Sequence, residues 1–469
     1  MKFIILQFLV LFLSSSLMAE IDRSQIPSAG PAPSIELGEV KTFTLSNGLK
    51  VFVVENHKLP SAYASLSLDN NPDVEGKIKG VSSLASSLLG NGSTTISKDD
   101  FHKEIDFMGA SLYVSTNGGY ASSLKRFFPR ILELMADTLI NPIFLVEEFD
   151  KEKAKLIDNI KSNQKNIAVV ANRVKNKLSY GKKHPFGEFL TLETVNNVSL
   201  DHVVSYYSSF VRPNNAYLVI VGDVEFDQIK TLVTTLFEPW NANPVPISKL
   251  PKVKNPKETS LYIVDMPNAV QSEIYVTNSF DLTMSNPDFF ALKLANHILG
   301  GSSTARLFMN LREDKGYTYG SYSRVSPNRY KALFSASASV RNEVTALSVY
   351  EMIAEVNKMI TDLVSTEELA AAKEKYIGSF IMATEKPSTI ANFALNIEQE
   401  NLPSTFYKNY INNIQKVTIE EINKVFQNYI LNDQLRVIIV GKKDDIIRDL
   451  SEFSYPIIFL DTYGDKEKK

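Results

Sequence analysis

The stretch Ala216-Tyr-Leu-Val-Ile-Val-Gly222 returns near the end of the chain as Leu435-Arg-Val-Ile-Ile-Val-Gly441. Each copy is a run of apolar, mostly β-branched residues that ends in glycine and precedes a helical pattern, which predicts a buried strand leading into a helix. A second pair of segments, Leu88-Leu-Gly-Asn-Gly-Ser-Thr94 and Ile298-Leu-Gly-Gly-Ser-Ser-Thr304, repeats in the same order. The chain therefore contains two similar halves, as expected of a duplicated domain.

The remaining pattern predicts an α+β fold for both halves. Short amphipathic strands, several of them joined as hairpins, occur together with amphipathic helices, so we expect antiparallel sheets with helices packed on one face. The hairpin Thr42–Val54 is the clearest, with Asn47-Gly48 as its primed turn. Five prolines between Pro239 and Glu258 predict a linker, across which the halves are expected to form a clam-like pair.

The N-terminus predicts export. Met1-Lys2 precedes an apolar run from Phe3 to Leu13, which is too short to span a bilayer and is typical of a signal peptide that ends at Ala19. Retention of this run as a membrane anchor is the alternative. We thus predict a signal peptide at 1–19, domains at 36–238 and 259–462 with the linker 239–258 between them, a periplasmic location, and no stable membrane insertion after cleavage.

The composition argues against several classes of function. A net charge of −3 provides no general basic field, so nucleic acid is not expected as a partner. The chain has no cysteine, which rules out disulfides and thiolate metal ligands.

The segment Gly80–Thr94 predicts a short amphipathic helix with a polar face of three serines. Ser83, Ser86 and Ser87 have the i, i+3, i+4 spacing that places side chains on one side of a helix. From the residues alone, this face is most simply solvated or bonded internally. No G-x-S-x-G elbow surrounds the serines, so a nucleophilic serine is not supported.

Several segments resemble a known family beyond the layout of the halves. They are Leu45–Val53, Phe149–Ile160, His184-Pro-Phe-Gly187, Pro213-Asn-Asn215, Val219–Asp223, Gln271-Ser272, Leu299–Phe308 and Leu311–Tyr319. Together they resemble the inverzincin peptidases, the family of insulinase, pitrilysin and the mitochondrial processing peptidase. The resemblance covers nearly the whole exported chain.

The resemblance implies that a zinc site has been lost. Family members bind zinc through an H-x-x-E-H helix and a glutamate from a later helix, and the motif glutamate is the general base. Here Ser83 and Ser87 stand at the histidine positions, Ser86 at the base and Asn159 at the later ligand. No i, i+4 histidine pair replaces them among His57, His102, His184, His202 and His297. We therefore expect no metal in this chain and no catalysis by it alone.

The second half keeps another feature of the family, the pair Arg312 and Tyr319. The resemblance implies that a guanidinium at Arg312 binds a substrate carbonyl or carboxylate, and that the Tyr319 phenol donates to the developing oxyanion. As isolated residues, Arg312 could equally pair with Glu313 or Asp314, and Tyr319 could belong to the core.

These features lead to one functional hypothesis and two alternatives. The hypothesis is a non-catalytic, substrate-binding subunit of a periplasmic two-chain zinc peptidase, with Arg312 and Tyr319 supplied in trans to a zinc-bearing partner of the same fold. The first alternative is a stand-alone peptide-binding or scaffolding protein that acts without proteolysis, as a homodimer for example. The second is a peptidase with an unrecognised metal site, which metal analysis would reveal.

Overall fold

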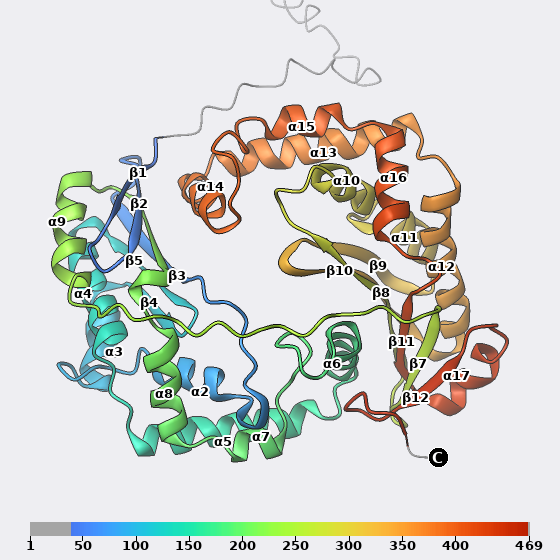
Figure 1. The fold of residues 1–469 in the computed structure, drawn as a ribbon, viewed down its shortest axis with the longest axis horizontal. Coiled ribbons are helices and arrows are strands. Elements are labelled where there is room, and N and C mark those ends of the chain that lie inside the picture. The colour runs from blue at the N-terminus through green and yellow to red at the C-terminus, as the bar shows by residue number, and fades with distance from the viewer. Residues whose placement is uncertain (1–38, 468–469) are drawn as a thin grey trace, which may run out of the picture. The chain divides into compact units, whose positions relative to one another are not determined.

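The computed structural model describes residues 39–467 (Figure 1). The predicted signal peptide lies outside this range. Within the described part of the chain, no helix has both the length and the apolar character needed to cross a membrane.

The first half is built on a six-stranded sheet with the order β1-β2-β6-β3-β5-β4. β2 lies parallel to β6, and the other neighbouring strands are antiparallel. The strands are β1 (Lys41–Thr44), β2 (Lys50–Glu55), β3 (Ser61–Leu68), β4 (Ser111–Ser115), β5 (Gly118–Leu124) and β6 (Ala216–Gly222). The helices are α2 (Val81–Leu88), α3 (Lys98–Met108), α4 (Phe128–Ile140), α5 (Val146–Asn163), α6 (Ile167–Tyr180), α7 (Leu192–Asn196), α8 (Leu200–Phe210) and α9 (Phe226–Phe237).

The second half contains another six-stranded sheet, with the order β12-β7-β11-β8-β10-β9. Its strands are β7 (Ser260–Asp265), β8 (Gln271–Leu282), β9 (Thr318–Ser326), β10 (Asn328–Arg341), β11 (Arg436–Gly441) and β12 (Ile457–Leu460). Its helices are α10 (Phe289–Gly300), α11 (Arg306–Phe308), η5 (Met309–Asp314), α12 (Thr345–Thr361), α13 (Thr366–Thr384), α14 (Pro387–Gln399), α15 (Tyr410–Lys416), α16 (Ile419–Tyr429) and α17 (Lys443–Leu450).

The duplication is visible in the strand order. The series β2-β6-β3-β5-β4 corresponds to β7-β11-β8-β10-β9. In each series the closing strand, which comes last in the chain (β6 or β11), lies between the two strands that come first in the chain, β2 and β3 or β7 and β8. This closing strand is parallel to one neighbour and antiparallel to the other. The predicted α+β fold with two similar halves is confirmed. The sheets are mainly antiparallel, and the parallel pairs β2–β6 and β7–β11 arise because the closing strand returns after a series of helices. In the second sheet β12 adds one more parallel pair, with β7.

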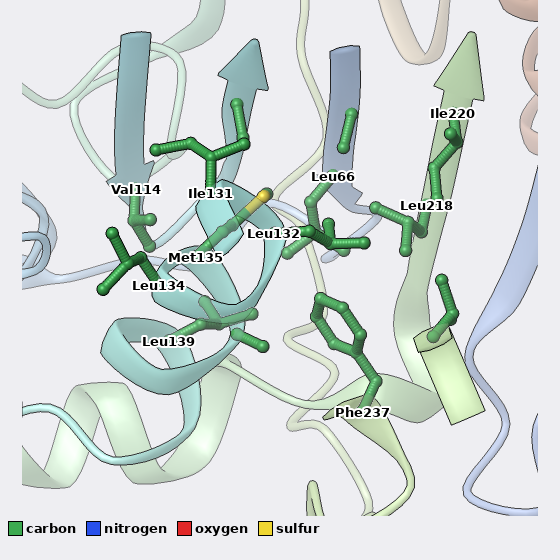
Figure 2. Packing of buried hydrophobic residues seen from close by; sticks show 14 of the residues in the cluster. Leu66, Val114, Ile131, Leu132, Leu134, Met135, Leu139, Leu218, Ile220 and Phe237 are labelled. Atoms are coloured by element: carbon green, nitrogen blue, oxygen red, sulfur yellow. The ribbon is translucent and has the colours of Figure 1, made fainter. Parts of the chain in front are cut away.

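The main core of the first half lies between its sheet and helices α3, α4 and α9. Figure 2 shows Leu132 and Met135 of α4 beside Leu66 of β3, with Leu218 and Phe237 on the neighbouring β6 and α9. Each of these side chains is at most 4% exposed. Burying a side chain of this size stabilises a fold by about 1.5–3 kcal/mol.

The opposite face of each sheet receives a helix from the other half. α14 places Ala391, together with Ala394 and Leu395, against Phe52, Val54, Val219 and Val221 of the first sheet. α6 places Val170, Ala171 and Val174 against Val264, Ile438 and Val440 of the second. The sequence predicts helices on one face of each sheet, and this holds for the helices that belong to the same half. The other face of each sheet is covered by the helix from the other half, α14 on the first sheet and α6 on the second.

We expect the substitution Ala391→Asp to detach α14 from the first sheet. Ala391 is fully buried in an apolar contact, and an unpaired carboxylate there costs several kcal/mol. The variant should melt at a lower temperature than the parent and be cleaved faster within α14 by a protease. Ala371→Asp on the exposed side of α13 is the matched control, and equal effects of the two substitutions would contradict the expectation.

One local prediction is wrong in detail. The hairpin between β1 and β2 is not closed by a two-residue primed turn at Asn47-Gly48. Leu45 N donates to Leu49 O at 2.9 Å, which leaves a three-residue loop in which only Gly48 has a positive φ, of 94°. The Asn47 amide instead donates to the carbonyls of Phe237 and Trp240, at 2.7 and 3.1 Å. This side-chain attachment to the end of α9 favours the longer loop.

Candidate functional site

The predicted serine helix is present as α2. Its apolar side, Val81, Leu84, Ala85 and Leu88, is buried against α5 and α8. On α5 the contact includes Leu156, which lies one helical turn before Asn159. The two helices that the resemblance assigns to the zinc ligands are thus packed together.

The side chains at the four assigned ligand and base positions are three hydroxyls and one amide, and those of Ser86, Ser87 and Asn159 have hydrogen-bond partners. Ser86 Oγ lies 2.7 Å from the hydroxyl of Thr116, in the turn between β4 and β5. Ser87 Oγ donates to the carbonyl of Ser83 at 3.0 Å. The Asn159 amide oxygen, on the exposed side of α5, accepts from Asn163 at 2.8 Å. Across residues 39–467, no group of three or more His, Cys, Asp or Glu side chains is placed to hold a metal.

A buried carboxylate fixes the start of α2. Gly80, the residue before the helix, has a φ of 118° and no side chain to cap the first turn. Glu75 takes over this role, because its carboxylate accepts from Gly80 N at 2.9 Å, Ser82 N at 3.2 Å and Lys79 Nζ at 2.7 Å. Burial alone would raise the pKa of Glu75, but Lys79 and these N–H donors outweigh it and hold the pKa below its ordinary value.

We expect Glu75→Gln to destabilise the protein by about 2 kcal/mol at neutral pH. The neutral amide no longer attracts the Lys79 ammonium, and its own NH2 group would face a backbone N–H that needs an acceptor. The folded pKa lies below the unfolded value, so the carboxylate stabilises above pH 4.5 and loses this effect as the pH falls through the folded pKa. The difference between parent and variant should therefore shrink in acid.

Urea denaturation at pH 7 and at pH 3–4 measures this difference. Glu374→Gln, at an exposed position in the middle of α13, is the control. A Glu75→Gln effect that is independent of pH would show that the carboxylate charge does not stabilise α2.

Arg312 lies in an unusual helical segment. The short helix α11 continues into η5, which is a π-helix over Met309–Asp314. Such wide turns are rare and occur frequently at functional sites. The Asn310 amide of η5 donates to Glu351 at 2.9 Å and to Glu355 at 2.7 Å, which ties the segment to α12.

The structure brings Arg312 and Tyr319 together. Arg312 Nη1 donates to the carbonyl oxygen of Tyr319 at 3.1 Å, and Nε donates to Glu313 at 3.2 Å. Pairing with Glu313 is therefore real, but it leaves the Arg312 side chain 40% exposed. Tyr319 is 87% exposed at the start of β9, which excludes its placement in the core.

Both residues line one hollow of about 470 Å³. Sequence reasoning did not assign Gln271, Ser339 or Arg341 to this site, although they line it too. Gln271 and Arg341 are directly opposite each other on β8 and β10, a register that the sequence pattern does not give. The lining offers guanidinium, phenol, hydroxyl and amide groups, which suits the carbonyl and carboxylate oxygens of a peptide.

Two carboxylates belong to the same region: Glu313 lines the hollow and pairs with Arg312, and Glu273 lies behind Ser339. Glu273 on β8 accepts a hydrogen bond from the Ser339 hydroxyl, and burial raises the pKa of Glu273. The Glu273 carboxylate is therefore a hydrogen-bond acceptor directly behind Ser339, one of the residues that line the hollow.

Comparison with known proteins assigns this chain to a family. Residues 71–184 match the family model described as Insulinase (Peptidase family M16), and residues 197–376 match the one described as Peptidase M16 inactive domain. The chain belongs to the insulinase family of peptidases.

Relatives from bacteria match over most of their length. The chain is 22% identical over 406 residues to "Uncharacterized zinc protease YmxG" of Bacillus subtilis, covering 84% of this chain and 96% of the relative. It is 24% identical over 415 residues to "Non-peptidase homolog YmxG" of Helicobacter pylori, covering 85% and 94%. A crystal structure of a peptidase M16 inactive domain from Pseudomonas fluorescens has the same fold, with a TM-score of 0.78, 20% identity and coverage of 86% and 98%.

Proposed function

We propose that the chain is the non-catalytic, substrate-binding subunit of a two-chain zinc peptidase that acts on peptides in the periplasm. A partner of the same fold supplies the zinc and the general base, and this chain supplies Arg312 and Tyr319 in trans. The proposal draws on the asymmetry of the two halves. Ser83, Ser86 and Ser87 provide neither a good zinc ligand nor a base at neutral pH, while the second half keeps its donor pair.

The contact between Arg312 and Tyr319 carries the proposal. A residue with a purely structural role is normally buried or fully paired, whereas Tyr319 is 87% exposed and its backbone carbonyl holds a guanidinium whose side chain is 40% exposed. Arg312 uses Nε and Nη1 within the chain, and its Nη2 has no hydrogen-bond partner among residues 39–467. Both N–H donors of Nη2 therefore remain for an oxygen that comes from outside.

The chemistry assigned to the pair requires a substrate held in an extended form. An extended peptide adds as a strand to a sheet edge in the partner, because main-chain hydrogen bonds give affinity without a fixed sequence. The guanidinium would then hold a substrate oxygen, and the phenol would donate to the oxyanion that develops on the scissile carbonyl. The zinc itself belongs to the partner.

Reconstitution tests the proposal. The exported chain is purified alone and mixed with a zinc-bearing relative from the same organism, and cleavage of a fluorogenic peptide is followed as the ratio changes. We expect no cleavage and no stoichiometric zinc for the chain alone, and a rise in activity that saturates at one chain per partner.

Two outcomes would contradict this proposal. Full activity of the partner alone, with peptide affinity in the present chain, would favour a stand-alone peptide-binding protein. Stoichiometric zinc and cleavage by the chain alone would favour a peptidase with an unrecognised metal site.

A further inference from the structure

A second hollow lies at the far end of the first sheet. It is a groove of about 610 Å³ where the ends of β3, β5 and β6 meet the start of α14. Ser86 of α2 contacts Thr116 at the other end of β5, whereas the groove reaches Leu124 at the end of that strand. The groove is therefore separate from the serine helix, and neither Arg312 nor Tyr319 lines it.

The floor of the groove is aromatic. Tyr63 and Tyr120 stack with ring centroids 5.8 Å apart, and Tyr120 is 42% exposed. Leu59 and Leu124 stand at the edge, 68% and 46% exposed. The Tyr63 hydroxyl is buried next to Ser388 and forms no hydrogen bond of normal geometry within residues 39–467. Exposed apolar side chains that gather in a hollow with polar groups are typical of a binding site.

The rim of the groove carries an excess of positive charge. Lys58 and Lys386 line it without an ion-pair partner in the described part of the chain, against one lining carboxylate, Glu385. The nearby Asp223 is already shared by His57 and Lys125, at 2.7 Å each. These cations favour an anionic group at the mouth.

The start of α14 adds to this charge. α14 is a 13-residue helix with no side-chain cap, and Ser388 of its first turn lines the groove. The first residue of α14, Pro387, has no N–H, and Thr389 N donates to Lys386 O at 2.9 Å. The Ser388 N–H and the positive end of the helix dipole are therefore the groups that attract an anion. The apolar floor and the positively charged rim thus belong to the same groove.

We propose that this groove binds the C-terminal residue of a polypeptide whose last side chain is apolar. The side chain lies on Tyr63 and Tyr120, and the terminal carboxylate lies between Lys58, Lys386 and the first turn of α14. A C-terminal residue is favoured over an internal acidic residue because it carries an apolar side chain and a carboxylate on the same Cα. The site does not require a zinc-bearing partner.

Fluorescence anisotropy with the full exported chain tests the proposal. The probe is a fluorescein-labelled hexapeptide, Gly-Ser-Gly-Ser-Ala-Phe, with a free carboxylate. A second peptide is amidated at its end, and a third continues after phenylalanine with aspartate and three more residues to an amidated end. We expect the amidated and the extended peptides to bind about tenfold more weakly, as loss of a charge-assisted contact predicts.

Variants locate the site. Lys386→Glu should weaken binding of the free-carboxylate peptide about tenfold, and Tyr120→Ala should weaken all three peptides. Lys230→Glu, an equal charge change on the exposed side of α9, should leave binding unchanged. Circular dichroism and thermal melting confirm that each variant is folded.

Three results would overturn the proposal. Equal affinity of the free and amidated ends would show that the carboxylate is not recognised. Equal affinity of the extended peptide would assign the groove to internal acidic residues. Absence of peptide binding at millimolar concentration, with self-association of the chain that Tyr120→Ala abolishes, would assign the groove to an interface between two copies.

Discussion

Replacing Arg312 with alanine is expected to lower kcat/KM of the reconstituted two-chain peptidase about 100-fold, and Tyr319→Phe to lower it by a similar factor. Loss of one preorganised donor to the developing oxyanion typically costs two to three orders of magnitude. Both side chains are exposed and contribute little to packing, so the variants should fold and bind the partner normally. Cleavage of a fluorogenic peptide measures the change, and co-purification measures the assembly.

The chain offers a matched control for this experiment. Arg448 is an exposed arginine that pairs with the next residue, Asp449, at 3.0 Å, as Arg312 pairs with Glu313. Arg448→Ala should leave activity unchanged. Arg312→Lys should recover little, because an ammonium lacks the planar fork of the guanidinium. Wild-type activity of Arg312→Ala in a complex of normal stoichiometry would remove the pair from the mechanism.

A zinc site is expected to return when its assigned positions are filled. The combined substitutions Ser83→His, Ser86→Glu, Ser87→His and Asn159→Glu place two imidazoles one turn apart on α2 and a carboxylate on the packed α5. We expect one zinc ion per chain with a Kd of about 1 μM or lower, since two imidazoles and a carboxylate form a catalytic-type zinc site. Metal analysis after dialysis and competition with a chelator measure the affinity.

Alanine at the same four positions is the control for this variant, and it should hold no zinc. A folded variant with two histidines and two glutamates that retains no metal would contradict the assignment. It would show that Asn159, or the direction of the serine face, does not correspond to the ligand geometry of the family.

Local signals in the sequence predict many elements of the fold. The apolar runs at β6 and β11 are buried strands, and Ser199, a residue type favoured at helix starts, caps α8. The strand β5 was not foreseen. Its sequence Gly-Gly-Tyr-Ala-Ser-Ser-Leu contains two glycines, and Ala121 is the one hydrophobic side chain of the strand that is buried, so no apolar alternation appears.

Non-local contacts account for most of what the sequence pattern does not predict. The parallel pairing of β2 with β6 depends on a strand that arrives about 160 residues later, and no local periodicity encodes it. The spacing of Arg312 and Tyr319 is visible in the sequence, but the π-helix that carries Arg312 is not. Its attachment through Asn310 to α12 depends on packing between separate helices.

The exchange of α6 and α14 has a consequence for how the protein could have arisen. A single half on its own would leave Phe52, Val54, Val219 and Val221, or their counterparts in the second sheet, facing water. The helix that covers the first sheet, α14, comes from the second half, and the first half gives its own α6 to the second sheet. Two identical copies could satisfy each other by reciprocal donation, as in a swapped homodimer. Fusion of two such copies would preserve both contacts and free each half to change separately, so that one could lose its metal ligands while the other kept its donors.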